Sequence, residues 1–141
     1  MKKLKKLAIV ALCIAITFCF SGCAKMQELK AQTKQATINF FEYIRQEDYH
    51  SALTIFRSSV MNADDLIELV HQWEDEEKVD FSLPFKIIYK KEAEYSHYSS
   101  YTNGPKLKVI YWVEIGDQKR TLRVISTNKD NHFGIISFYF L

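Results

Sequence analysis

Few residues of this chain stand in spacings typical of catalysis or ligand binding. Two of its three cysteines, Cys13 and Cys19, lie inside an apolar N-terminal run. The sequence holds no His-Glu-x-x-His, Gly-x-Ser-x-Gly, phosphate-loop or Asp-x-Asn-x-Asp-Gly pattern. Residues 128–132 have calcium-like side chains, but the twelfth loop position is not Glu, and a turn is the better interpretation. We therefore expect no metal and no cofactor.

The N-terminal segment has the charge and length of a secretory signal. Four lysines precede Leu7–Phe20, a run without charge that would be about 21 Å long as a helix, shorter than a bilayer's hydrocarbon layer of about 30 Å. The next residues, Phe20-Ser21-Gly22-Cys23, resemble the lipobox of bacterial lipoproteins, with Phe20 where Leu is usual. The resemblance implies cleavage after Gly22 and a diacylglycerol (with palmitate-like chains) on Cys23. The alternative is an uncleaved anchor.

The lipobox resemblance also implies a location in the cell envelope. Two or three acyl chains on Cys23 would hold the protein stably, because each buried methylene contributes about 0.8 kcal/mol. In the sorting pattern of such lipoproteins, Ala24 rather than Asp after the cysteine favours the outer membrane of a cell with two membranes. In a cell with one membrane, the protein would lie on the outer face of the plasma membrane.

Removal of residues 1–22 would change the charge balance. These residues hold four of the 19 basic side chains and none of the 17 acidic ones, so 15 basic and 17 acidic side chains remain. A mildly acidic domain has no electrostatic reason to bind nucleic acid. Cys23 would then be the last cysteine, so neither a disulfide nor a cysteine zinc site is expected.

The expected organisation is a signal peptide (1–22), a lipidated cysteine with a polar tether or helix extension (23–35) and a single domain (36–141). Apolar residues follow helical spacing from Ile38 onward. Two further helices are expected after the N-caps Asp48 and Asn62, the second with Asp65 completing a capping box.

After Pro84 the hydrophobic period changes from 3.6 to 2. We expect strands or hairpin arms over 85–91, 95–101, 106–115 and 133–141. A two-residue turn at Gly116-Asp117 would place Ile115 opposite Gln118. Helices followed by an antiparallel meander predict an α+β fold, with the N-terminal helices packed on one face of a curved antiparallel sheet of about four strands.

The segment Phe40–Phe56 resembles the start of bacterial nuclear transport factor 2-like (cystatin-like roll) domains. In these domains a long helix ends at a Gly-Asp-aromatic turn before a short helix containing Ala, and Glu47 stands here where Gly is usual. The resemblance implies a curved sheet around helices, often with a pocket, in which catalytic members place a carboxylate, His or Tyr. The candidates here are Tyr43, Asp48, His71 and Tyr111. Capping, core packing or plain exposure explains each of them more simply.

Two polar segments have different explanations. Tyr95–Gly104 has the Tyr/Ser/Asn/Gly composition of adaptable binding loops, and its candidate binding residues are Tyr95, His97, Tyr98 and Tyr101. An ordinary hairpin is the simpler alternative. The acidic stretch Glu74–Asp80 is best explained as a solvated helix end.

Both faces of the expected sheet contain apolar residues. One face carries Leu107, Val109, Tyr111, Leu122, Val124 and Ile135, and it suits the helices. The other carries the candidate partner surface, made of Ile110, Trp112, Arg123, Ile136, Phe138 and Phe140. On this register, Trp112→Glu or Phe138→Glu would leave the fold intact and break self-association.

The sequence therefore favours a membrane-anchored envelope lipoprotein with a small, non-catalytic binding domain. Its partner would be an apolar small molecule in a pocket, or a protein on the sheet face, either a second copy or another envelope protein. The alternative is a pocket enzyme of isomerase or hydrolase type with a Tyr/Asp or His acid–base pair. A purely structural lipoprotein is a third option.

Overall fold

The computed structural model describes residues 2–57 and 60–141, and of residues 2–22, 92 and 93 it describes the backbone but not the side chains. The side chains of the expected signal peptide and of the lipobox residues before Cys23 thus lie outside the described part. The helices are α1 (Lys2–Arg45), α2 (Tyr49–Leu53) and α3 (Ala63–Glu77), and the strands are β1 (Phe85–Ser99), β2 (Gly104–Ile115), β3 (Gln118–Lys129) and β4 (His132–Phe140).

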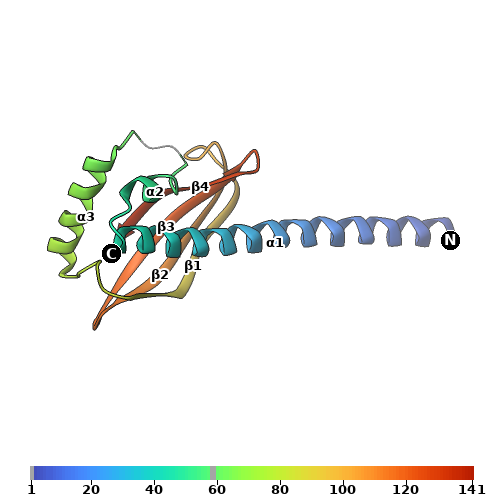
Figure 1. Ribbon diagram of the computed structural model, residues 1–141. Coiled ribbons are helices and arrows are strands. Elements are labelled where there is room, and N and C mark those ends of the chain that lie inside the picture. Colours follow the sequence, from blue (N-terminus) through green and yellow to red (C-terminus); the bar gives the residue numbers. More distant parts are fainter. Residues whose placement is uncertain (1, 58–59) are drawn as a thin grey trace.

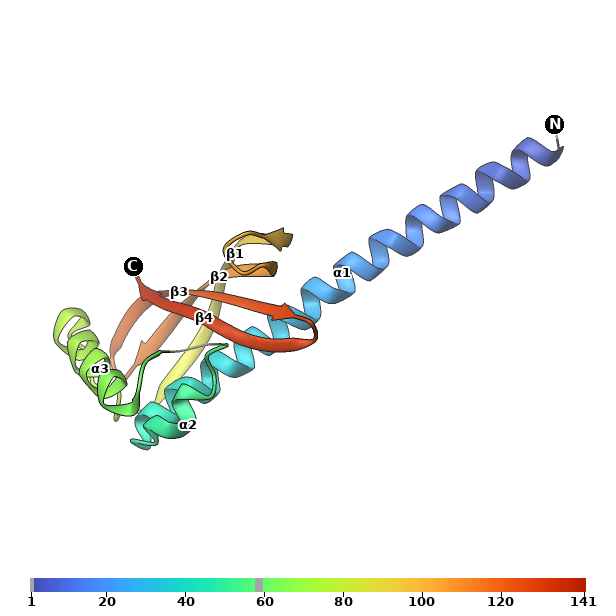
Figure 2. The same ribbon diagram turned by 90° about the horizontal axis from the view of Figure 1, so that it is seen from above.

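The expected α+β fold is confirmed. The four strands form one antiparallel sheet in the order β1-β2-β3-β4. Helix α1 crosses the sheet and contacts all four strands, and its N-terminal half projects from the domain (Figure 1). Helices α2 and α3 lie near the C-terminal end of α1, as the view from above also shows (Figure 2).

Helix α1 ends in a left-handed turn at Glu47, where φ is 57°. The Asp48 amide donates to the Tyr43 carbonyl at 2.9 Å, and the Glu47 amide donates to the Ile44 carbonyl at 3.0 Å. This pair of hydrogen bonds is a Schellman motif, which usually has Gly at the left-handed position. Glu47 thus takes the left-handed conformation that Gly usually adopts at this position of the motif.

The expected caps of the next two helices are present. Asp48 Oδ1 accepts from the Ser51 amide at 3.1 Å, and the Asn62–Asp65 capping box has both hydrogen bonds, at 2.9 and 3.0 Å. Helix α2 ends at Leu53 and does not extend to Phe56. Phe56 instead forms a parallel bridge to Ile135 of β4.

The expected β2–β3 register is confirmed, with Ile115 opposite Gln118. Gly116 has φ 58° and Asp117 does not have positive φ. A type II′ turn requires this combination. The expected turn before the last strand is also present: Asp130 and Asn131 both have positive φ, the type I′ pattern. Strand β1 joins the two separately expected segments, 85–91 and 95–101, into one bulged strand that ends at Ser99.

The prediction that Phe138 and Phe140 belong to the partner surface is wrong, because β4 contains a bulge. Ser126 pairs with Ile135, whereas the preceding Ile125 pairs with Ser137, so Ile136 is an extra residue. A bulge reverses the alternation beyond it. Phe138 and Phe140 therefore share the face of Ile135, and Phe138 is only 6% exposed, with its ring stacked on Phe40 at 4.5 Å.

The packed region begins earlier than the expected boundary at residue 36. Leu29 is 2% exposed, and the fully buried Thr33 contacts Ser126 of β3 through its hydroxyl. Helix α1 is continuous through residues 23–35. This segment is therefore a helix extension that packs against the sheet, not a free tether.

Aromatic rings fill the space between α1, α3 and the sheet. Phe40 contacts Phe41, Phe56, Trp73 and Phe138, with ring centroids 4.5–6.3 Å apart. Most of these pairs are edge-to-face, an arrangement that rings favour over a parallel sandwich. This cluster occupies the concave side of the sheet, where the resemblance implied a pocket.

Candidate functional site

The four candidate acid–base residues lie on different elements. Tyr43 is half-buried on α1, and His71 is exposed on α3. Asp48 caps α2, and hydrogen bonds from the side chain and backbone of Ser51 hold the pKa of its carboxyl below the usual value. Tyr111 is buried on β2, and burial raises the pKa of its phenol well above the usual value. The three cavities described below are each lined by at most one of these four.

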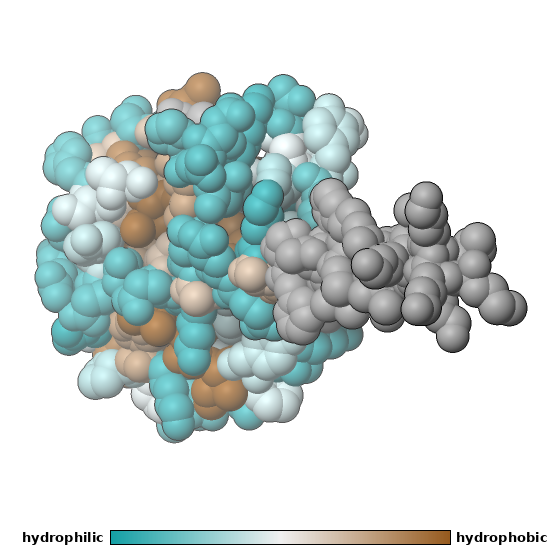
Figure 3. All heavy atoms as spheres, turned by 90° about the vertical axis from the view of Figure 1, so that its right-hand side faces the viewer, coloured by the Kyte–Doolittle hydropathy of each residue, from teal (hydrophilic) through white to brown (hydrophobic). Residues whose placement is uncertain are grey.

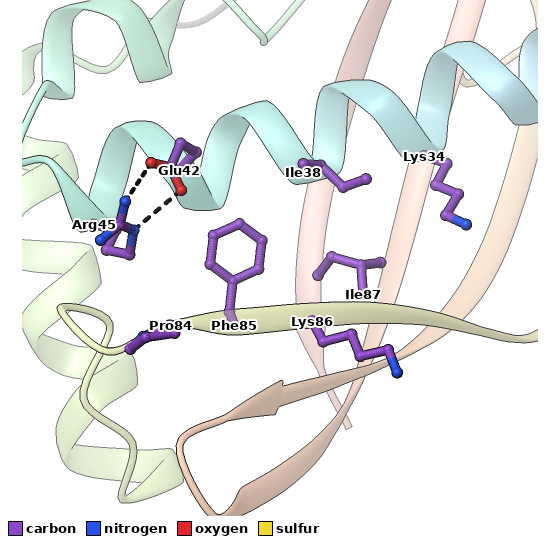
Figure 4. A pocket seen from close by; sticks show the side chains of 8 residues that line it. All are labelled: Lys34, Ile38, Glu42, Arg45, Pro84, Phe85, Lys86 and Ile87. Atoms are coloured by element: carbon purple, nitrogen blue, oxygen red, sulfur yellow. Dashed lines mark hydrogen bonds and ion pairs between the residues drawn. The ribbon is translucent and has the colours of Figure 1, made fainter.

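The largest of these cavities, about 530 Å³, is a groove between α1 and the start of β1 (Figure 4). Ile38 faces Phe85 and Ile87 across the gap, and these side chains form an apolar floor. Glu42 and Arg45 form an ion pair at one end, at 2.5 Å, and this contact lowers the pKa of Glu42. The groove thus has an apolar surface but no described cluster of catalytic groups.

A second cavity, of about 290 Å³, lies between α1 and strands β1 and β2. Tyr111 and Tyr89 line it, with Lys30 on the helix side. The Lys30 ammonium lies 5.9 Å from the centre of the Tyr89 ring. A cation held over an aromatic ring explains this contact without any catalytic role.

A third cavity, of about 230 Å³, contains the nearest approach to the expected acid–base pair. His71 and Tyr49 both line it, together with Glu47 and Glu74. Burial raises the pKa of Tyr49, and the carboxylates of Glu47 and Glu74 raise it further. A phenol with a raised pKa is a weaker acid and supplies less phenolate at neutral pH, so this environment does not activate Tyr49 for proton transfer.

The helices leave one face of the sheet uncovered, and we call it the outer sheet face. Along β2, residues on this face are partly exposed, while those that alternate with them are buried. The described residues on this face include Lys86, Ile88, Lys90, Lys91, Glu94, Ser96, Lys106, Lys108, Ile110, Trp112, Glu114, Lys119, Thr121, Arg123, Ile125, Ser137 and Tyr139. Three residues of the expected partner surface, Ile110, Trp112 and Arg123, thus lie here.

Cations surround the aromatic rings of the outer sheet face. The Lys119 ammonium lies 3.8 Å from the centre of the Trp112 ring, and the Lys90 ammonium lies 5.4 Å from it. The Arg123 guanidinium lies 5.1 Å from the centre of the Tyr139 ring. These contacts are cation–π interactions, in which the ring face attracts the positive charge.

The outer sheet face carries an excess of positive charge. Seven of the residues named for it are basic and two, Glu94 and Glu114, are acidic, and Glu114 lies 3.8 Å from Lys119. Lys108 is paired with Glu94 at 2.8 Å. The face therefore combines an apolar centre of Trp, Tyr and Ile side chains with a basic rim.

The candidate binding loop forms the β1–β2 hairpin end. Tyr95 contacts His97, with 3.3 Å between the phenol oxygen and Nδ1. The Tyr98 hydroxyl donates to Asn103 Oδ1 at 3.2 Å, and Tyr101 points to solvent, 61% exposed. The four residues thus lie on one hairpin, with Tyr98 and Tyr101 more exposed than any other described aromatic side chain.

Sequence reasoning overlooked the two lysines beside Trp112. The predicted register places Thr121 opposite Trp112, so it also makes Lys119 a diagonal neighbour of Trp112, and this contact could have been predicted. The contact of Lys90 with Trp112 could not, because Lys90 is the extra residue of a bulge in β1 between Tyr89 and Lys91. Residues 90–94 are mostly charged, so hydrophobic alternation does not locate this bulge.

Among the described residues, no group of three or more His, Cys, Asp or Glu side chains is placed to hold a metal ion. Within the same part of the chain, no helix has the length and hydropathy to cross a membrane. No family model, curated protein or solved structure matches the chain. The two resemblances above therefore stay predictions.

Proposed function

We propose that this chain is a lipid-anchored protein of the cell envelope that binds an acidic protein partner, without catalysis, on its outer sheet face. The supporting observation is the position of Trp112, half-buried on an uncovered face between Lys119 and Lys90. Trp, Tyr and Arg side chains dominate the binding energy of many protein interfaces. A basic rim favours a partner of opposite charge.

The filled interior supports a surface site over a pocket. The rings around Phe40 occupy the concave side of the sheet, and the three cavities described above lie between surface elements. The enzyme alternative stays a prediction, and its best location is the cavity of Tyr49 and His71.

Site-specific photo-crosslinking tests the proposed surface. A photoreactive side chain at Thr121, opposite Trp112, should crosslink the lipidated protein to a partner in its own membrane. Lys119→Glu should abolish this product, because it reverses the charge beside Trp112. Lys34→Glu on α1 is the matched control and should leave the product unchanged. A product that persists with Lys119→Glu, or none at all, refutes this surface.

The anchor is tested separately. Cys23→Ser should abolish incorporation of labelled fatty acid and should leave the full-length precursor, since the thioether cannot form without the sulfur. Incorporation of label into the Cys23→Ser variant would place the lipid elsewhere. A wild-type protein with no label and an intact Met1 would refute lipidation.

A further inference from the structure

The domain packs against α1 almost up to the proposed lipidation site. Leu29 is 2% exposed, and Met26 is partly buried. Leu29 is six residues further along the helix than the exposed Cys23, a rise of about 9 Å. This inference rests on the proposed lipid anchor, because a lipidated Cys23 would then hold the domain at the membrane surface.

Two hairpin ends lie on the side of the domain that faces Cys23. The Asn128 side chain donates to Gln32 Oε1 at 3.2 Å, which places the β3–β4 turn beside α1. Gly104, at the start of β2, lies against the Lys129 side chain, so the β1–β2 hairpin ends next to that turn. Figures 1 and 2 show both hairpin ends on the side from which α1 leaves the domain.

The β1–β2 hairpin carries exposed tyrosines on a defined loop. Tyr98 is 67% exposed and Tyr101 is 61% exposed. The loop is held by the Tyr98–Asn103 hydrogen bond and by the Thr102 hydroxyl, which donates to the Gly104 carbonyl at 2.8 Å. Residues 95–106 contain no acidic side chain, so nothing in the loop repels an anionic lipid surface.

We propose that the β1–β2 loop, through Tyr98 and Tyr101, rests on the lipid headgroups of the membrane that holds Cys23. Tyrosine favours the membrane interface, where its ring is partly buried and its hydroxyl stays hydrated. The face of the domain on this side is mostly hydrophilic, with scattered hydrophobic patches (Figure 3). The contact therefore lies at headgroup depth, and it fixes the orientation of a domain that one lipidated residue alone would leave free to tilt.

Bromolipid quenching of an added tryptophan tests the contact. Lipidated full-length Tyr98→Trp is placed in vesicles of phosphatidylcholine and phosphatidylglycerol, with or without bromines near the headgroup end of the acyl chains. The matched control is Tyr139→Trp, because Tyr139 is 46% exposed on the outer sheet face. The emission of Trp73 and Trp112 is subtracted with the wild-type protein. A thermal transition equal to that of the wild type shows that each variant is folded.

The expected result is loss of a large part of the added emission of Tyr98→Trp, with a blue shift, and no loss for Tyr139→Trp. If the protein floats with the vesicles and Tyr98→Trp is not quenched, the loop contact is refuted while the anchor stands. Equal quenching of both variants also refutes it, because the domain then has no preferred orientation. If the acylated protein does not float with the vesicles, the anchor itself fails and the loop contact fails with it.

Discussion

The hydroxyl oxygens of Thr33 and Ser126 lie 2.6 Å apart in the interior, and they join helix α1 to strand β3. Thr33 donates its own proton to the Leu29 carbonyl at 2.6 Å, so Ser126 is the donor in the pair. Both residues are fully buried. A buried hydroxyl without its partner is destabilising, and this pair therefore fixes where α1 sits along the sheet.

A double-mutant cycle measures that link. Ser126→Ala should lower the free energy of unfolding by about 1 kcal/mol, and Thr33→Val by about 1–3 kcal/mol, because it strands the Ser126 hydroxyl. The double variant should lose less unfolding free energy than the sum of the two single losses, and denaturant titration measures all three values. Thr37→Val is the control, since the Thr37 hydroxyl donates within α1 to the Thr33 carbonyl. Additive losses for Thr33→Val and Ser126→Ala would contradict the coupling.

The bulge at Ile136 gives a second prediction, because it determines which face Phe138 occupies. Phe138→Ala should lower the free energy of unfolding by about 3–5 kcal/mol, the loss typical of a buried aromatic ring. Trp112→Ala, on the outer sheet face, should lower it by about 1 kcal/mol. Chemical denaturation of the two variants measures both values. Equal losses would show that β4 lacks the bulge and that Phe138 lies outside.

The left-handed Glu47 offers a stabilising substitution. An L-residue at positive φ is strained by about 1–2 kcal/mol, while Gly adds entropy to the unfolded chain. Glu47→Gly should therefore raise the free energy of unfolding by about 0.5–1 kcal/mol. Gln46→Gly, one residue earlier at negative φ, is the matched control and should lower it. A Glu47→Gly variant with a lower melting temperature than the wild type would refute the Schellman ending of α1.

Because Tyr111 is buried, we expect the folded protein to lose stability at alkaline pH. Its pKa is raised in the folded state by burial, so the folded protein keeps the phenol proton at a pH where the unfolded chain has lost it. The stabilising contribution is complete below the unfolded pKa of about 10 and declines as the pH rises above it. Tyr111→Phe should therefore show a smaller fall in unfolding free energy between pH 8 and pH 11. The unfolding free energy of Tyr98→Phe, a change at an exposed position, should fall as much as that of the wild type over the same pH range.

Local patterns alone were sufficient for much of the fold. The capping box of Asn62 and Asp65 depends on two residues three apart, and the turn at Gly116-Asp117 needs Gly at its first position. With the turn known, alternation places Tyr111 opposite Leu122 and Lys119 diagonally beside Trp112. These features depend on interactions between neighbours in the chain or across one tight turn, and composition and spacing contain that information.

Tertiary contacts decided the rest. The bulge at Ile136 lies beside a contact with a distant segment, where Ile135 is bridged to Phe56 and hydrogen-bonded to Ile55 and Arg57. The bulge displaces Phe138 from the expected surface into the core. The sequence left a tether and a helix extension open for residues 23–35, because the partner of Thr33 is Ser126, 93 residues away. Hydrophobic periodicity carries no information about pairs so far apart, and only the folded chain brings them into contact.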